Sequence, residues 1–250
     1  MKERVHPTAA EGFDRNAASY ARARPSYPTG AVDAVLADLG LAAGDAVCDL
    51  AAGTGLMTRL LVERDLDVVA VEPVAGMRDQ LAGALPSVTV LDGTAEAIPS
   101  PDGTFDAVVV AQAFHWFRFT EALAEIARVV RPGGGLAVVF NKRDDREPWV
   151  RRWSEIIDWH QKTVSSYERT DWTAVLAGGG FTGVQHHTVH WVQPLDRALL
   201  ADRVRSVSYI GVMEEAEQQR YVDQVVALTD GFAEPFDLGY DTLVWTARKG

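Results

Sequence analysis

An acidic residue, a glycine-rich turn and a second acidic residue follow one another in the N-terminal half of the chain. The turn is Asp49–Gly55 (DLAAGTG), and Glu72 comes 17 residues after Gly55. Gly53 and Gly55 let the backbone pass close under a ligand, because glycine adopts conformations that other residues resist. The helix that should follow would present free N–H groups, and the Glu72 carboxylate could accept both hydroxyls of a ribose. This spacing predicts the binding of a nucleoside.

A dinucleotide such as NAD is the competing ligand for a loop of this kind. Its fingerprint, G-x-G-x-x-G/A, opens tightly so that a helix N-terminus can hold a pyrophosphate. Here Gly53 and Gly55 are followed by Thr58, so the third small residue is missing. Asp49 also places a negative charge beside the loop, which suits an amine or a sulfonium better than a pyrophosphate. A plain glycine turn that joins a strand to a helix is the remaining alternative.

Alternating strands and helices are expected to position these residues. Short apolar runs ended by turns are typical of strands buried on both faces, and amphipathic stretches separate them. The expected strands are Ala46–Leu50, Asp67–Val71, Val88–Leu91, Phe105–Val110 and Gly135–Phe140. The expected helices are Thr29–Leu39, Leu56–Arg64, Ala75–Leu85 and Thr120–Val130. This order implies a parallel sheet with right-handed crossovers, in which ligands bind beyond the carboxyl ends of the strands.

The second half of the chain is expected to close this sheet. Val184–Val192 and Thr242–Ala247 indicate two more strands, whose spacing allows an antiparallel closure. Between them, Leu195–Val207 and Glu214–Thr229 have helical patterns. We interpret these helices as an insertion over the carboxyl edge of the sheet and not as an independent domain.

Composition and charge narrow the possible partners. The chain has 250 residues, 47% of them hydrophobic and 24% charged, as in ordinary globular proteins. A net charge of −11 would repel a phosphate backbone, so no nucleic acid partner is expected. Met1–Ala10 lacks the apolar region of a signal peptide, and no apolar run approaches the roughly 18–20 residues of a membrane span. We therefore expect a cytoplasmic enzyme without a membrane partner.

Several stretches together resemble the class I S-adenosylmethionine-dependent methyltransferases. Those similar to the family's first two motifs are Val47–Leu56 (VCDLAAGTGL) and Val69–Pro73 (VAVEP). Those similar to later motifs of its small-molecule branch are Asp92–Pro99 (DGTAEAIP) and Phe105–Phe117 (FDAVVVAQAFHWF). The resemblance runs from about Phe13 to Phe140 and is closest to methyltransferases of type 11 and of the trans-aconitate kind. Ala51 stands where the usual D-x-G-x-G-x-G pattern has its first glycine.

The resemblance implies that these positions bind S-adenosylmethionine, which leaves as S-adenosylhomocysteine. Positions expected at the methionine part and the ribose, with their neighbours in the two motifs, are Asp49, Ala51, Gly53, Gly55, Glu72 and Pro73. Positions expected around adenine are Met77, Thr94, Ala95 and Glu96. Gln112 and Ala113 would contact the sulfonium side, while Tyr20 and Arg24 would close over the cofactor carboxylate. For Met77 a simple core contact is an equal alternative.

The same resemblance sets the expected fold and domain organisation. It implies an α/β, Rossmann-like, seven-stranded, mostly parallel sheet with an antiparallel last strand, helices on both faces and a helical cap insertion. We expect a single methyltransferase domain over residues 1–250. Within it, residues 1–40 would form an N-terminal helical cap, 41–142 the cofactor-binding core, and 143–250 the substrate-side helices and closing strands.

The residues that follow the fourth expected strand would lie beside the transferred methyl group. His115 could act as a general base for a hydroxyl or an acidic C–H, or it could be a structural imidazole beneath the cofactor. Trp116 offers one indole donor, and the HWF run resembles a stretch of carboxyl methyltransferases in which a tryptophan holds the acceptor carboxylate. Core filling is the alternative for Trp116. No N/D-P-P-Y/F tetrapeptide is present there, which counts against nucleobase amino groups as acceptors.

Two later clusters have both a functional and a structural explanation. Trp149, Trp153, Trp159 and Trp172 lie within 24 residues, and they could line an acceptor pocket or form the buried side of a helix. The second explanation is favoured for most of them. The polar residues of the RVRSVSY stretch that could contact an acidic substrate, or form a solvated helix face, are Arg203, Arg205, Ser206 and Tyr209.

No metal site is expected from the histidines or from the single cysteine. On a strand His186 and His190 would share a face but lie roughly 13 Å apart, too far for one ion, and His187 would point the other way. Cys48 precedes Asp49 on a strand expected to be buried, which favours packing over reactivity.

The sequence therefore predicts S-adenosylmethionine-dependent methyl transfer to a small molecule, with a carboxyl or hydroxyl oxygen as the acceptor. His115 and Trp116 are the candidate catalytic residues. The first alternative is methylation of nitrogen or carbon in a small molecule. A dinucleotide-dependent oxidoreductase is a less favoured alternative. A protein that binds the cofactor without transferring a methyl group is a third. A monomer or a homodimer is expected.

Overall fold

The described part of the chain forms two compact units. The structure, a computed structural model, describes residues 24–157, 170–207 and 209–250. The sheet unit contains the segments 26–141, 170–189 and 242–250. The helical unit contains the segments 24–25, 142–157, 190–207 and 209–241. Each unit is therefore assembled from stretches that are far apart in the sequence.

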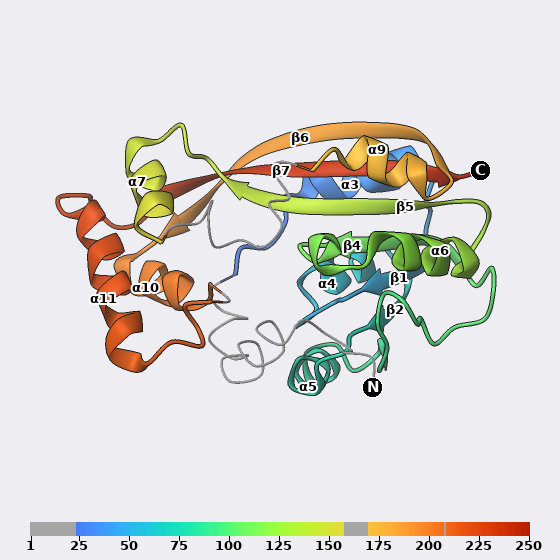
Figure 1. The fold of residues 1–250 in the computed structure, drawn as a ribbon, viewed down its shortest axis with the longest axis horizontal. Helices are drawn as coiled ribbons and strands as arrows, with labels where there is room; N and C mark the ends of the chain where they lie inside the picture. The colour runs from blue at the N-terminus through green and yellow to red at the C-terminus, as the bar shows by residue number, and fades with distance from the viewer. Residues whose placement is uncertain (1–23, 158–169, 208) are drawn as a thin grey trace. The chain divides into compact units, whose positions relative to one another are not determined.

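Seven strands in the described residues form one sheet in the order β3-β2-β1-β4-β5-β7-β6 (Figure 1). They are β1 (Ala46–Leu50), β2 (Asp67–Val71), β3 (Thr89–Leu91), β4 (Phe105–Ala111), β5 (Val130–Arg143), β6 (Phe181–Leu195) and β7 (Phe236–Lys249). The pairs β1–β2, β1–β4, β2–β3 and β4–β5 are parallel, whereas β7 runs opposite to β5 and β6 (Figure 1). The expected mostly parallel sheet with an antiparallel last strand is confirmed. Its strand order reverses between β1 and β4, where open sheets of this kind bind ligands.

Helices flank the sheet and alternate with its parallel strands, as expected. In the sheet unit they are α3 (Thr29–Leu39), α4 (Leu56–Val62), α5 (Ala75–Ala84), the short η1 (Phe114–Trp116), α6 (Phe119–Val129) and α9 (Trp172–Gly178). In the helical unit they are α7 (Pro148–Ile156), α10 (Arg197–Arg205), α11 (Glu215–Val226) and the short η2 (Ala227–Thr229). Helices α10 and α11 occupy the stretch between β6 and β7 in which two helices are expected from the sequence.

The late strands are longer than the apolar runs that indicate them. Val184–Val192 lies inside β6, and Thr242–Ala247 lies inside β7. The buried side chains at the start of β7 alternate with partly or fully exposed ones, so no continuous apolar run marks where the strand begins. Likewise β5 begins at Val130, directly after α6, and so includes residues before the start of the expected strand Gly135–Phe140.

An apolar core holds the strands of the sheet unit in place. The helix α3 contributes Val32 and Val35, and β1 contributes Val47, all of which are buried. Each fully buried valine or leucine contributes roughly 1.5–3 kcal/mol of transfer free energy. The carboxyl ends of β1 and β4 are therefore fixed from within the unit, and so are the loops that leave them.

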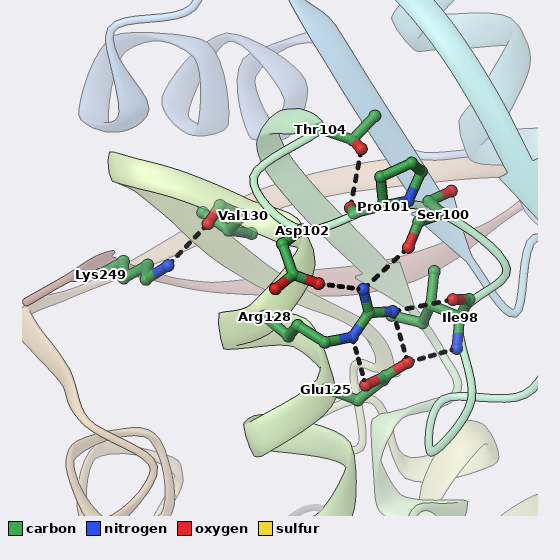
Figure 2. A network of polar contacts seen from close by, with 9 residues as sticks. All are labelled: Ile98, Ser100, Pro101, Asp102, Thr104, Glu125, Arg128, Val130 and Lys249. Atoms are coloured by element: carbon green, nitrogen blue, oxygen red, sulfur yellow. Dashed lines mark hydrogen bonds and ion pairs between the residues drawn. The ribbon is translucent and has the colours of Figure 1, made fainter.

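A polar network fastens the loop before β4 onto α6 (Figure 2). The guanidinium of Arg128 pairs with both carboxylate oxygens of Glu125, at 2.8 and 2.7 Å, and with Asp102 at 2.7 Å. It also donates to the backbone oxygens of Ser100 and Ile98, at 2.9 and 3.0 Å. The pKa of Glu125 lies below its usual value, chiefly because of its hydrogen bonds with Arg128. This fork of five hydrogen bonds is a geometry that only arginine supplies.

We predict that an Arg128→Lys variant keeps the fold but loses about 1–3 kcal/mol of unfolding free energy, because lysine leaves backbone oxygens of the loop without their donor. Urea denaturation at neutral pH measures the loss. Arg220→Lys is the matched control, since Arg220 also pairs with a glutamate three residues earlier, Glu217, but both side chains are largely exposed. That change should cost about 0.5 kcal/mol or less. Equal losses of unfolding free energy in the two variants would contradict the stabilising role of the Arg128 network.

Candidate functional site

Asp49 is a fully buried carboxylate near the carboxyl end of β1. Its exposed fraction is 1%, and Thr58 of α4 donates a hydrogen bond of 2.6 Å to Oδ2. Among the described residues, Oδ1 of Asp49 has no hydrogen-bond partner. Burial raises the pKa of Asp49 to about 7, while the Thr58 hydrogen bond lowers it and the charge of Glu72 raises it. A buried oxygen of this kind requires a donor, which a ligand can supply.

The loop between β1 and α4 takes left-handed backbone conformations at alternate residues. The φ angles are +57° at Ala51, +59° at Gly53 and +86° at Gly55. A Cβ atom on Gly55 would lie 2.9 Å from Cγ of Leu81, so a glycine is required there by space as well as by conformation. Ala51 adopts its conformation at a cost of roughly 1–2 kcal/mol, and its N–H is held by Val71 O at 2.7 Å. The usual glycine of the family pattern would avoid this strain.

Glu72 joins this loop to the turn that follows β2. The side chain is 4% exposed; Oε2 accepts a hydrogen bond of 2.9 Å from Gly53 N, and Oε1 accepts one of 2.8 Å from Val74 N. Burial raises the pKa of Glu72, and the two backbone hydrogen bonds counteract it. A carboxylate has about four acceptor positions, so two are left for the hydroxyls of a ligand. Pro73, which lies between Glu72 and Val74 in the sequence, is half-buried.

The residues expected around an adenine ring lie on α5 and on the turn after β3. Met77 is buried, and its sulfur lies 3.8 Å from where a Cβ of Gly53 would be, so it packs under the loop. Thr94 and Ala97 pair through two backbone hydrogen bonds, and Ala95 between them is buried. The carboxylate of Glu96 accepts a hydrogen bond from Arg118 N at 3.0 Å. Glu96 therefore ties this turn to the loop after β4.

The end of β4 is held by a polar residue that the sequence analysis missed. Gln112 has a φ of +61°, a strained conformation for this residue type, and its Nε2 donates to Asn141 O at 3.1 Å. Asn141 on β5 is buried and bonds Ser26 O at 2.9 Å and the Thr242 hydroxyl at 2.6 Å. A polar residue directly after the apolar run Gly135–Phe140 was the available signal. Ala113, half-buried, follows Gln112 and precedes η1.

His115 and Trp116 lie together on η1, directly after β4. Both side chains are half-buried, and their ring centroids are 4.9 Å apart. The imidazole also lies 5.7 Å from the ring of Phe140 on β5. Phe114 beneath them is fully buried against Trp172, at 5.6 Å. The short helix thus presents two partly accessible side chains on a fixed aromatic base.

Arg24 lies in the helical unit, and Tyr20 lies outside the described residues. The Arg24 guanidinium donates to the backbone oxygen of Ser206 at 2.8 Å. Of the polar residues in the RVRSVSY stretch, Arg203 is buried, so the solvated-face explanation is wrong for it, whereas Arg205 is half-buried.

The three histidines considered for a metal make separate contacts. His186 stacks on Trp245 with ring centroids 4.4 Å apart. His187 bonds Asp38 at 2.8 Å, and His190 bonds Asp241. Within residues 24–157, 170–207 and 209–250, no group of three or more such ligands is placed to hold a metal ion.

The tryptophans of the 149–172 stretch differ from one another in burial. Trp153 and Trp172 are fully buried, as the core explanation expects, and Trp149 is half-buried and stacks on Trp153. Trp159 lies outside the described residues.

Similar sequences are methyltransferases over most of their length. A family described as "Methyltransferase domain" matches residues 48–138. An uncharacterized methyltransferase of Mycobacterium bovis is 42% identical over 233 residues, which cover 90% of this chain and 91% of the relative. An uncharacterized methyltransferase-like protein of Schizosaccharomyces pombe is 33% identical over 243 residues, covering 95% of each chain.

Solved structures share the fold at much lower identity. A putative methyltransferase from an antibiotic biosynthesis pathway of Anabaena variabilis has a TM-score of 0.65 at 19% identity and covers 89% of this chain and 98% of that one. Phosphoethanolamine N-methyltransferase 2 of Haemonchus contortus, solved in complex with S-adenosyl-L-methionine, has a TM-score of 0.59 at 15% identity and covers 98% of this chain and 60% of that one. The fold and the two long sequence matches agree. This chain belongs to the S-adenosylmethionine-dependent methyltransferases, and S-adenosylmethionine is its methyl donor.

Proposed function

We propose that this methyltransferase transfers the methyl group to a small-molecule acceptor, at a carboxyl or hydroxyl oxygen. In this proposal residues 1–250 act as one methyltransferase domain, with 1–40 as a cap, 41–142 as the cofactor core and 143–250 as the substrate side. The enzyme works in the cytoplasm as a monomer or homodimer, without a nucleic acid or membrane partner. The oxidoreductase alternative is set aside, because the long sequence matches are to methyltransferases.

The observation that carries the cofactor site is the buried Oδ1 of Asp49, which has no partner among the described residues. An ammonium group supplies the missing donor, and its positive charge favours the ionised form of Asp49. Glu72 has acceptor positions left for two ribose hydroxyls, and Gly53 and Gly55 keep the loop backbone open to a ligand. The residues present therefore fit S-adenosylmethionine, which when bound supplies a methyl group on a positively charged sulfur.

The remaining cofactor residues act through packing and positioning in this proposal. Met77 and Ala95 supply the apolar wall for adenine. Those that complete the surroundings of the cofactor are Arg24, Ala51, Pro73, Thr94, Glu96, Gln112, Ala113 and Tyr20. Gln112 matters most among these, since its strained backbone and its bond to Asn141 fix the loop after β4.

An oxygen acceptor is supported by the pair on η1. The His115 imidazole can take a proton from a hydroxyl at neutral pH, whereas a carboxylate needs no base. The Trp116 indole can donate one hydrogen bond to an acceptor oxygen. Both side chains are partly accessible and rest on a buried aromatic base. A nitrogen acceptor is the second candidate, favoured by the fold likeness to phosphoethanolamine N-methyltransferase 2.

We predict that Glu72→Gln weakens S-adenosylhomocysteine binding about 10- to 100-fold. The amide lacks one acceptor oxygen and loses hydrogen bonds to a charged group, each worth about 1.5–3 kcal/mol. Isothermal titration calorimetry measures the change. Glu63→Gln, an exposed change at the end of α4, is the control and should leave the affinity within about twofold. Unchanged binding by Glu72→Gln would remove the ribose assignment.

We predict that S-adenosylhomocysteine binding releases a proton below pH 7. The Asp49 pKa is raised to about 7 in the free protein, and a bound ammonium lowers it. The dissociation constant should therefore fall by up to about tenfold per pH unit between about pH 5 and 7, and level off above.

Asp49→Asn tests the source of this proton. The variant should flatten the pH profile, whereas Asp45→Asn, an exchange in the turn before β1 and outside the site, should leave it unchanged. Titrations in two buffers of different ionisation enthalpy count the protons released. A wild-type profile that is flat, or one that Asp49→Asn does not alter, would count against the assignment of the ammonium to Asp49. Glu72 also has a raised pKa, so a shallow residual slope in Asp49→Asn is expected.

We predict that His115→Ala lowers kcat by about 10²–10⁴ for a phenolic or other hydroxyl acceptor, because the base is lost. Labelled-methyl transfer is measured with a panel of carboxylic acids and phenols. Trp116→Phe should instead raise the KM of a carboxylic acid, since one donor to the acceptor is lost. His186→Ala, which removes an exposed imidazole, is the control. Full activity of both His115→Ala and Trp116→Phe on every acceptor would exclude the catalytic roles of the pair.

A further inference from the structure

Three segments of the sheet unit meet at Asn141. This residue follows Phe140 on β5, and it is 7% exposed. Its Oδ1 accepts a hydrogen bond of 2.6 Å from the Thr242 hydroxyl on β7, and its Nδ2 donates one of 2.9 Å to Ser26 O, shortly before α3. Its backbone oxygen accepts one of 3.1 Å from Gln112 Nε2, at the end of β4. A single residue therefore ties these three segments together.

Gln112 ends β4 by using its side chain where the strand would use its backbone. Ala111 lies opposite Val139 in the parallel pair of β4 and β5, and Gln112 N donates to Val139 O at 2.8 Å. Strand carbonyls point alternately to the two neighbouring strands, so the next carbonyl on this side of β5 is that of Asn141. The Gln112 side chain takes this carbonyl, which leaves the following backbone free to turn. The φ of +61° at Gln112 is costly for a residue with a side chain and persists only where its surroundings hold it.

The turn at Gln112 leads directly into η1, which carries the two candidate catalytic residues. Ala113 precedes η1, and His115 and Trp116 lie on it. The same end of β5 also contacts η1 through a side chain, since the ring of Phe140 lies 5.7 Å from the imidazole of His115. A shift of this end of β5 would therefore displace η1 and both of its candidate residues.

We propose that Asn141 is a positioning residue for methyl transfer and that the Thr242 hydroxyl orients it. The hydrogen bonds of the Asn141 amide hold the end of β5, and the backbone oxygen of Asn141 then holds Gln112 and the turn into η1. A displacement of about 1 Å in the reacting groups can lower a rate about 100-fold, so this network contributes to kcat. The inference rests on the proposed role of η1 in catalysis and adds the residues that position it.

The affinity for the methyl donor should depend little on this network. The two carboxylates proposed to bind the donor, Asp49 and Glu72, receive hydrogen bonds from α4, from the loop after β1 and from the turn after β2. These segments differ from the ones that Asn141 joins. A defect in positioning should therefore lower kcat and leave the binding of S-adenosylhomocysteine nearly unchanged.

The Thr242→Val variant tests the proposal, because valine keeps the shape of threonine and lacks the hydroxyl. We expect kcat to fall about 10- to 100-fold for every methylated member of a panel of carboxylic acids and phenols. The affinity for S-adenosylhomocysteine, measured by calorimetry, should stay within about threefold. Thr242→Ser keeps the donor and should retain kcat within about threefold. An affinity loss as large as the loss of kcat, or an unchanged kcat in Thr242→Val, overturns the proposal.

Two further variants separate positioning from a general loss of stability. Asn141→Asp keeps the acceptor for Thr242 but turns a carboxylate oxygen toward Ser26 O, so it should lower kcat at least as much as Thr242→Val. Thr246→Val is the matched control, since Thr246 is also buried on β7 and its hydroxyl donates to Asp38 Oδ2 at 2.6 Å. It loses a buried hydrogen bond outside the network and should leave kcat within about threefold. The same loss of kcat in Thr246→Val as in Thr242→Val overturns the proposal.

Fluorine NMR reports the position of η1 without any acceptor. In protein labelled with fluorotryptophan, the Trp116 signal is assigned by its loss in Trp116→Phe. Thr242→Val should shift this signal, whereas Thr242→Ser and Thr246→Val should leave it in place. A shifted signal together with no methylated acceptor in the panel supports the positioning role and counts against the proposed acceptor class. An unchanged Trp116 signal in Thr242→Val, or an equal shift in Thr246→Val, overturns the proposal.

Discussion

The buried carboxylate of Glu72 holds the carboxyl edge of the sheet in one arrangement. It accepts hydrogen bonds from Gly53 N in the loop after β1 and from Val74 N in the turn after β2. A buried N–H left without an acceptor costs about 1–3 kcal/mol, so both segments depend on this one side chain. The oxygens that fix the protein backbone are also the ones that would receive a ribose. The conformation of the loop and the proposed binding of a ribose therefore depend on the same side chain, Glu72.

Glu72 also determines the electrostatics beneath the loop. Its charge adds to the effect of burial on Asp49, whose pKa is raised to about 7. Two buried carboxylates close to each other repel when both are ionised, and a positively charged ligand offsets this repulsion. The charge of Asp49 beside the loop would disfavour the pyrophosphate of a dinucleotide, which agrees with the family to which the chain belongs.

The sequence predicts local features well and long-range ones poorly. The glycine turn, Glu72 and the strand–helix alternation follow from patterns within about thirty residues, and the structure has them. Asn141 was missed because its role depends on Gln112, Ser26 and Thr242, which only the folded sheet brings to it. Arg203 looks like a surface residue on α10 in the sequence but is buried, and the ring of Tyr240 on β7 lies close to its guanidinium group. Positions of this kind are set by tertiary packing, which no local pattern records.

The buried acids of the sheet unit suit the chemistry of a methyl donor with a positively charged sulfur. This unit buries Asp49 and Glu72, and both carboxylates favour a cation. In the transfer of a methyl group from a sulfonium the positive charge of the donor is lost, so the reaction gains from surroundings that hold the reactants out of water. Water would stabilise the charged reactants more than the dispersed charge of the transition state. Fixed carboxylates such as Asp49 and Glu72 can replace water around a bound cation, so water can be excluded while the cation is still stabilised.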